Sequence, residues 1–148
     1  MTSTMRSGPE TTTIRETAER FFDACERGKG WEVCRQYCTP DASFSAQADA
    51  LTGITTLEAY TNWLQGLLTP VPNASYEIRA FAVDEARNVV LGFGVFKGTH
   101  SGAGGPLPPT GKSVAAEYVY AMEFDGDRIR HMTKIWNDGH SLKQLGWA

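Results

Sequence analysis

At 148 residues, the chain has the length of a single domain with one core. Its 14 basic and 17 acidic side chains give a formal charge of −3 and form no long blocks, so we expect no nucleic-acid partner. The longest apolar run is far shorter than the roughly 20 residues that a membrane span needs. Residues 1–12 are polar rather than an apolar signal core, so we expect a cytoplasmic protein that does not contact membranes.

Residues 1–12 are rich in Thr and Ser and have little apolar content, which predicts a flexible tail before a single domain at 13–148. Thr13 and Glu16 have the spacing of a capping box. Apolar residues then follow helical spacing up to Gly28, so the pattern predicts an amphipathic first helix.

Three cysteines, Cys25, Cys34 and Cys38, fall in this helical first quarter. Their odd number argues against a disulfide framework, and no His or further Cys lies near them in the sequence. We therefore interpret them as small buried apolar residues, and we expect neither a metal nor a cofactor.

Helical spacing continues from Trp31 to Cys38, and this short second helix is expected to end at residues 39–41 because proline disfavours helical geometry in the residue before it. Residues 42–46 are interpreted as a short first strand.

A third helix is expected to begin at Thr55 or Thr56 and to end before Pro70. The period then changes to that of strands. The predicted strands are 75–83, 88–99, 113–125 and 128–138. Helices followed by four consecutive antiparallel strands indicate the α+β class, with helices covering one face of a curved sheet.

The last two strands are separated only by Gly126 and Asp127, which predicts a tight hairpin. By alternation, one face carries Tyr118, Tyr120, Met122, Met132, Lys134 and Trp136. The other face carries Val119, Ala121, Ile129, Thr133 and Ile135. An aromatic, cation-bearing face suggests a ligand pocket, and the smaller aliphatic face suggests packing or a partner.

Several spaced segments resemble the SnoaL-like polyketide (ester) cyclase family of the nuclear transport factor 2-like superfamily. They are Gly-Thr-His-Ser-Gly at 98–102, Pro-Pro-Thr-Gly-Lys at 108–112, Phe-Asp-Gly-Asp-Arg-Ile at 124–129, Trp-Asn at 136–137 and Leu-Lys-Gln-Leu-Gly at 142–146. The detailed match covers about the last third of the chain.

This resemblance implies a cone-shaped barrel: a strongly curved, mostly antiparallel sheet with three N-terminal helices on its concave face, around an apolar cavity. It also implies pairing through the outer face of the sheet. The family's cyclases use an Asp and a His as acid/base groups, and the corresponding positions here are Lys134 and Tyr120. A protonated lysine cannot accept the proton that a carboxylate accepts, and a tyrosine titrates near pH 10, so the family's own acid/base chemistry does not transfer unchanged.

Lys134 is the leading candidate for a catalytic residue, because an ammonium in an apolar setting loses its proton more readily or needs a partner. It could bind a carbonyl or acidic oxygen, polarise a carbonyl, or act as a base or Schiff-base nucleophile. The alternative is a buried ion pair with Asp41, Asp49 or another acid of the helical half.

Tyr118 and Tyr120 are the other catalytic candidates, since phenolic hydroxyls can donate to an oxygen that gains negative charge. The alternative is that both are core residues with a satisfied hydroxyl. The candidate ligand-binding residues are Trp136, Met132, Met122, Tyr60 and Trp63.

Histidines are few and scattered. His131 is expected on the outer face, and His100 is expected to anchor the loop that follows it. Asp138, His140 and Ser141 have the residue types of a hydrolase triad, but their crowding favours a helix start capped by Asn137 or Asp138.

The sequence therefore predicts a small-molecule-binding protein with an apolar pocket, and possible acid/base or carbonyl chemistry on a hydrophobic, oxygenated ligand. The alternative is a non-catalytic ligand-binding or assembly module with the same cavity. We also expect a homodimer through the outer sheet face, because Val119, Ala121, Thr133 and Ile135 would otherwise leave an apolar patch exposed.

Overall fold

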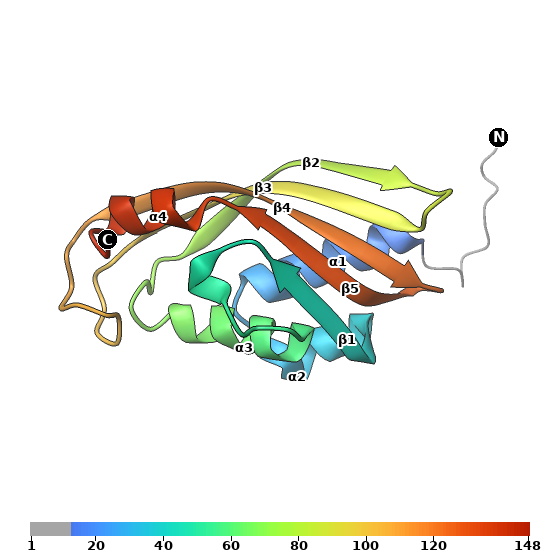
Figure 1. The fold of residues 1–148 in the computed structure, drawn as a ribbon, viewed down its shortest axis with the longest axis horizontal. Coiled ribbons are helices and arrows are strands. Elements are labelled where there is room, and N and C mark those ends of the chain that lie inside the picture. Colours follow the sequence, from blue (N-terminus) through green and yellow to red (C-terminus); the bar gives the residue numbers. More distant parts are fainter. Residues whose placement is uncertain (1–12) are drawn as a thin grey trace.

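Five strands form one curved sheet in the order β1-β5-β4-β3-β2 in the computed structural model, which describes residues 13–148 (Figure 1). The strands are β1 (Cys38–Ala46), β2 (Ser75–Asp84), β3 (Val89–Thr99), β4 (Ser113–Asp125) and β5 (Arg128–Trp136). The last four pair antiparallel in sequence order, and β1 joins the edge of β5 in parallel. The tail expected at residues 1–12 lies outside the described residues.

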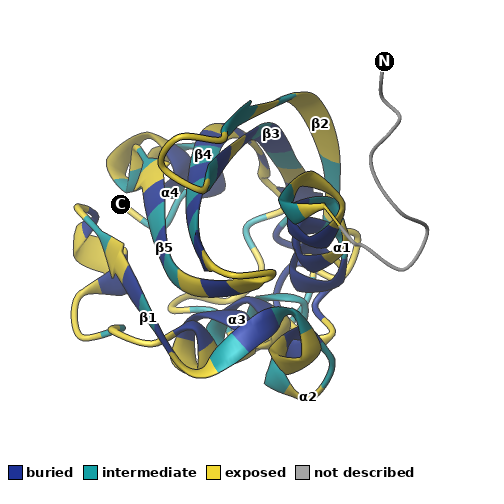
Figure 2. Cartoon of the chain, turned by 90° about the vertical axis from the view of Figure 1, so that its right-hand side faces the viewer, coloured by how far each residue is buried: buried dark blue, intermediate teal, exposed yellow. Residues whose placement is uncertain are grey.

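Three helices, α1 (Ile14–Glu26), α2 (Gly30–Cys34) and α3 (Leu57–Leu67), cover the concave side of the sheet, and α4 (Asp138–Leu145) packs along β4 at one end (Figure 2). The α+β class, with a strongly curved, mostly antiparallel sheet and helices on its concave face, is confirmed, and the sheet is unclosed. No helix within residues 13–148 is long and apolar enough to cross a membrane.

The predicted capping box begins α1. The Thr13 hydroxyl accepts from the Glu16 N–H at 3.1 Å, and the Glu16 carboxylate accepts from the Thr13 N–H at 3.0 Å. Phe21, Phe22 and Cys25 of the predicted apolar stripe are fully buried against the sheet. Two glycines of β3 permit this close packing: a Cβ at Gly92 would lie 3.1 Å from the Phe22 ring, and one at Gly94 would lie 3.1 Å from the same ring.

The prediction for residues 31–46 was partly wrong. The second helix ends at Cys34 and a 3-10 turn follows to Tyr37, so Cys38 begins a strand rather than ending a helix. Strand β1 contains Pro40, which an edge strand tolerates because its free side needs no N–H donor. Its pairing with β5 shifts register between Cys38 and Ser43.

The predicted hairpin is confirmed, with Gly126 at φ 62° in the turn, and β5 ends at Trp136 rather than at Asp138. Its register sets Tyr120 opposite Lys134 and Tyr118 opposite Trp136. The pairing then shifts at Arg130.

This shift reverses the expected orientation of Ile129. The side chain was predicted on the outer face, whereas the extra residue in β5 sets it opposite Phe124, fully buried in the core.

Candidate functional site

A cavity of about 260 Å³ is lined by residues of α3, β4, β5 and α4 and of the loop between β3 and β4. Figure 1 shows α4 and this loop together at one end of the fold. Its apolar lining includes Leu64 and Leu67 of α3 and Leu145 of α4. Its polar and aromatic lining includes Glu26, Trp63, Tyr118, Lys134 and Trp136, with Ser141 at the start of α4. The cavity thus combines an apolar volume with one cation and one acid.

Lys134 lies on the concave face of β5 and is only 7% exposed. Its Nζ donates a hydrogen bond to the Tyr60 hydroxyl at 3.0 Å and lies 4.1 Å from the centre of a Trp136 ring. Four further aromatic rings lie within about 6 Å of the Nζ. Within residues 13–148 no ion pair joins Lys134 to a carboxylate, so neither Asp41 nor Asp49 holds it.

Glu26, at the end of α1, is the acid beside this site, and it was missed in the sequence. It is 3% exposed, yet its carboxylate accepts from the Tyr118 hydroxyl at 2.5 Å and from the Tyr120 hydroxyl at 2.6 Å. The signal was present, because Glu26 follows Phe22 by four residues and therefore continues the buried stripe of the helix.

A continuous chain of hydrogen bonds joins the acid to the amine. The Lys134 Nζ donates to Tyr60, the Tyr60 and Tyr120 hydroxyls lie 2.5 Å apart, and Tyr120 donates to Glu26. Both tyrosines are fully buried and do not line the cavity. The chain therefore runs through the protein interior.

Burial shifts the pKa values of both ends toward each other. It lowers the pKa of Lys134 from 10.5 to about 8, although the Glu26 charge opposes the shift. Burial also raises the pKa of the Glu26 carboxyl, against the Lys134 charge and the two tyrosine hydrogen bonds. Burial and the nearby Glu26 charge raise the pKa of Tyr60, Tyr118 and Tyr120, so these hydroxyls stay protonated.

Some of the predicted site residues line the cavity, and the others are buried away from it. Lys134, Tyr118, Trp136 and Trp63 line the cavity. Tyr60 and Tyr120 lie behind Lys134 in the hydrogen-bonded chain. The other two candidate ligand-binding residues, Met122 and Met132, face each other across β4 and β5, are fully buried, and do not line the cavity.

The start of α4 is a helix cap. The Asn137 side chain accepts from the His140 N–H at 3.1 Å, as predicted, and the Ser141 hydroxyl accepts from the Trp136 indole N–H at 2.8 Å. Asp138 accepts from the Ala50 N–H instead of binding His140. These side chains do not form a hydrolase triad.

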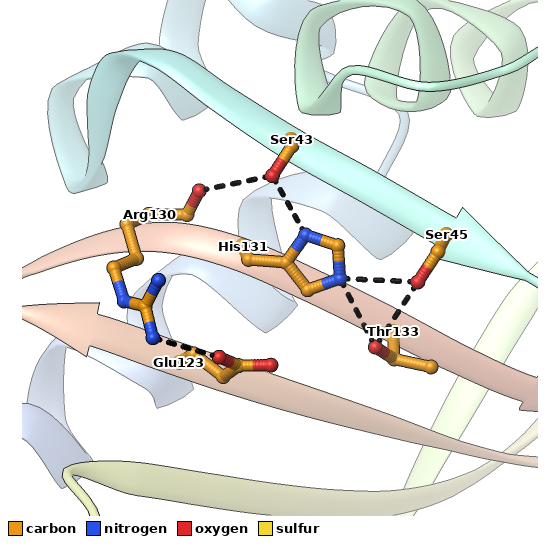
Figure 3. Close-up of polar contacts among 6 residues, drawn as sticks. All are labelled: Ser43, Ser45, Glu123, Arg130, His131 and Thr133. Carbon is orange, nitrogen blue, oxygen red and sulfur yellow. Dashed lines mark hydrogen bonds and ion pairs between the residues drawn. The ribbon is translucent and has the colours of Figure 1, made fainter.

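His131 lies on the outer face, as predicted, where it joins a group of hydroxyls from β1 and β5 (Figure 3). Its Nδ1 lies 2.7 Å from the Ser43 hydroxyl, and its Nε2 lies 3.0 Å from that of Ser45 and 3.2 Å from that of Thr133. The group does not line the cavity, so the Ser43–His131 contact joins two strands and is separate from the candidate site.

His100 anchors the loop after β3, as predicted. Its Nδ1 accepts from the Thr110 N–H at 3.2 Å and from the Trp147 indole N–H at 2.9 Å. Trp147 lines the cavity, so the hydrogen bond from its indole to His100 fixes the position of one cavity-lining side chain.

The three cysteines are free and buried, and within residues 13–148 no three His, Cys, Asp or Glu side chains gather in a group that could hold a metal ion.

A sequence model of the SnoaL-like polyketide cyclase family matches residues 16–145. No curated protein sequence matches the chain at a significant level.

Solved structures of similar fold include a candidate SnoaL-like polyketide cyclase from Jannaschia sp. CCS1, with a TM-score of 0.75 and 18% identity over 96% of this chain and 97% of that one. IdmH from Streptomyces antibioticus, a candidate polyketide cyclase, has a TM-score of 0.73 and 21% identity over 91% of this chain and 99% of that one. AclR from Streptomyces galilaeus, a candidate hydroxylase, has a TM-score of 0.73 and 17% identity over 91% of this chain and 82% of that one. At these identities the likeness shows the fold alone.

Proposed function

Because the chain belongs to the SnoaL-like polyketide cyclase family, we propose that it binds a small, hydrophobic, oxygenated molecule in its cavity and acts on it by acid/base or carbonyl chemistry. The observation that carries this proposal is the position of Lys134: a buried amine on the wall of an apolar cavity, with no carboxylate paired to it within residues 13–148.

Donor counting makes Lys134 the group that contacts the ligand. A protonated amine has three N–H donors, and Tyr60 receives one of them, so two remain for a ligand oxygen. The single hydroxyl hydrogen of Tyr118 is already given to Glu26. Tyr118 therefore holds Glu26 and the cavity wall in place, and it donates to a ligand only if it leaves that carboxylate.

The lysine can serve in either protonation state. With a pKa of about 8, roughly nine tenths of the amine is protonated at pH 7, and this ammonium can stabilise an enolate or alkoxide oxygen. Removing one such preorganised donor costs about 10²- to 10³-fold in rate in other enzymes. The remaining tenth is a neutral amine that can remove a proton next to a carbonyl.

The resemblance in sequence aligns Lys134 and Tyr120 with the family's Asp and His, and on this basis we place the chemistry on the lysine and not on a carboxylate base. Two hydroxyls separate Glu26 from Lys134 along the chain of hydrogen bonds, which leaves the amine free to meet a ligand.

The test compares Lys134→Met with Lys143→Met, which removes an exposed lysine of α4. Binding of naphthols and naphthyl ketones is followed by quenching of tryptophan fluorescence, and enolisation of the ketones by deuterium exchange. We expect Lys134→Met to weaken binding of the naphtholates at least tenfold and to abolish exchange, and Lys143→Met to behave as wild type. Equal binding and exchange in both variants, with both folded, would remove Lys134 from the site.

A non-catalytic ligand-binding or assembly module is the second candidate, and the outer sheet face favours its assembly part. Ile135 is 60% exposed and Leu91 is 44% exposed on this face, beside the half-buried Val119, Ala121 and Thr133. We propose that a second copy of the chain covers this apolar surface.

The free, buried cysteines lead us to propose a cytoplasmic location.

A further inference from the structure

We propose that Lys134 forms a covalent iminium with an aldehyde or ketone ligand, and that Glu26 stores the proton that this amine must lose. This inference rests on the proposed function and names its substrate class as carbonyl compounds. Three features support this proposal. The amine of Lys134 lies on the cavity wall, a chain of hydrogen bonds joins it to Glu26, and Tyr118 forms a second tyrosine hydrogen bond to the Glu26 carboxylate.

The chain has the polarity that a proton transfer from Lys134 to Glu26 needs. Lys134 donates to Tyr60, and Tyr120 donates to Glu26 Oε2, so a Tyr60 hydroxyl that donates to Tyr120 gives each of the two hydroxyls one donor and one acceptor role between the donating ammonium and the accepting carboxylate. Shifting one proton along each bond leaves a neutral amine and a protonated carboxyl. Both hydroxyls are fully buried, so the transfer needs no water.

The transfer removes two buried charges together. An isolated neutral amine beside a buried carboxylate, or an ammonium beside a protonated acid, would leave one charge uncompensated in the interior. Moving the proton between the two ends conserves the net charge of the site. Burial favours the neutral form of each group, which brings the two protonation states closer in free energy.

Tyr118 supplies the return path. Its hydroxyl contacts Oε1, the carboxylate oxygen that the chain from Lys134 does not use, and its side chain lines the cavity. Glu26 receives its proton from the interior on Oε2. For the return, the carboxyl group turns to bring this proton to Tyr118, whose oxygen accepts it while the hydroxyl turns its own hydrogen from the carboxylate toward a ligand.

The atoms balance in three steps. The Lys134 ammonium gives one proton to Glu26, and the neutral nitrogen then attacks the carbonyl carbon, whose C=O electron pair moves to oxygen. One nitrogen proton moves to that oxygen to give a carbinolamine. Glu26 returns its proton through Tyr118, the C–O bond breaks, water leaves, and the nitrogen lone pair forms the C=N bond of the iminium. Ammonium plus carbonyl has become iminium plus water, with Glu26 again ionised.

The neutral amine is abundant enough for this role. At pH 7 a lysine with a pKa of about 8 is about one tenth neutral, whereas one with the ordinary value of 10.5 is neutral in roughly one molecule in 3,000. Lys134 therefore offers about 300 times more nucleophile than an ordinary lysine.

The test traps the iminium in the full chain with 2-naphthaldehyde and sodium cyanoborohydride at pH 7. Intact mass and peptide mapping should show one naphthylmethyl group on Lys134, formed far faster than on Lys29, Lys97, Lys112 or Lys143. Probe binding is followed separately by fluorescence with 2-naphthalenemethanol, which has no carbonyl group. Binding of the alcohol with no adduct on Lys134 would overturn the iminium and leave the proposed function standing. A failure of both measurements would count against both.

The proposed role of Glu26, which holds the proton from Lys134 and returns it through Tyr118, is tested with Glu26→Gln and Tyr118→Phe. Their matched controls, Asp23→Asn and Tyr76→Phe, alter another carboxylate–tyrosine hydrogen bond of α1 that does not line the cavity. We expect a 10²- to 10⁴-fold slower adduct formation in Glu26→Gln and at least tenfold slower formation in Tyr118→Phe, with the controls within twofold of wild type.

Glu26 could act on Lys134 by exchanging a proton with it or only as a nearby negative charge, and these two roles predict opposite effects of Glu26→Gln on the rate of adduct formation. Its charge raises the pKa of Lys134, so if Glu26 acted only as a charge, Glu26→Gln would increase the neutral amine and speed adduct formation. Slower formation with unchanged binding of the alcohol supports the store, and faster or equal formation overturns it. If Glu26→Gln does not fold, Tyr118→Phe decides: adduct formation at the wild-type rate overturns the return path and, with it, the proposal.

Discussion

The buried amine makes a prediction about stability that needs no ligand. In the folded chain Lys134 has a pKa of about 8, and in the unfolded chain it has the ordinary value of 10.5. Between these two pH values the unfolded chain holds a proton that the folded chain has released, so the free energy of unfolding rises with pH. At about 1.4 kcal/mol per pKa unit, the gain is about 3 kcal/mol.

The perturbation is Lys134→Met, which keeps an unbranched side chain one atom shorter and removes the titrating amine. Urea unfolding at several pH values from 7 to 10.5, followed by circular dichroism, gives the free energy of unfolding for wild type and variant. We expect the free energy of unfolding of the wild type, relative to that of the variant, to rise by about 3 kcal/mol across this range. Below pH 8 the penalty on the buried charge is complete, and above pH 10.5 it is absent.

The control is Lys143→Met, whose difference from wild type should not change over the same range. Other groups that titrate in alkali cancel, because they are present in both chains. A flat difference between wild type and Lys134→Met would refute the burial of the charged amine. A difference that falls with pH would refute the direction of its pKa shift.

Three further outcomes are expected. Gly92→Ala should lower the free energy of unfolding by about 1–3 kcal/mol in urea, because its Cβ would lie 2.8 Å from the Phe81 ring. Gly66→Ala, in α3 with no atom near the new Cβ, should raise it by about 0.5–1 kcal/mol, and a loss there would contradict this packing. Ile135→Asp should convert a dimer into a single 16.2 kDa species in sedimentation at micromolar concentration, whereas a monomeric wild type would exclude the dimer.

The parts of the fold that depend on neighbours in the sequence could be predicted. The capping box at Thr13 needs only residues three apart, and the Gly126 turn joins adjacent strands, so both were found. The alternation that placed Lys134 with Tyr118 and Trp136 is equally local, and these three do line one cavity.

Features that depend on distant segments were missed. Nothing near Cys38 shows that this segment pairs with β5, and the shift of register at Arg130 that turns Ile129 inward depends on how β4 and β5 pair. The contact between Tyr60 and Tyr120 joins residues 60 positions apart. Only the folded chain brings them together.

Glu26 is a different kind of omission. Its position on the buried stripe of α1 could be read from the helical period, but a charged residue at the end of a helix is ordinarily solvent-exposed. The hydroxyls of Tyr118 and Tyr120 on β4 stabilise the buried carboxylate by donating hydrogen bonds to it. Both residues lie more than 90 positions away in the sequence.

The most direct test of the central claim is an NMR titration of the Lys134 side chain in the full chain, assigned by comparison with Lys134→Met. We predict a midpoint near pH 8 in the free protein, and a rise of this midpoint when 2-naphtholate occupies the cavity, because a bound anion favours the ammonium. A midpoint near 10.5 that does not respond to the ligand would show an amine in water, and it would contradict the account.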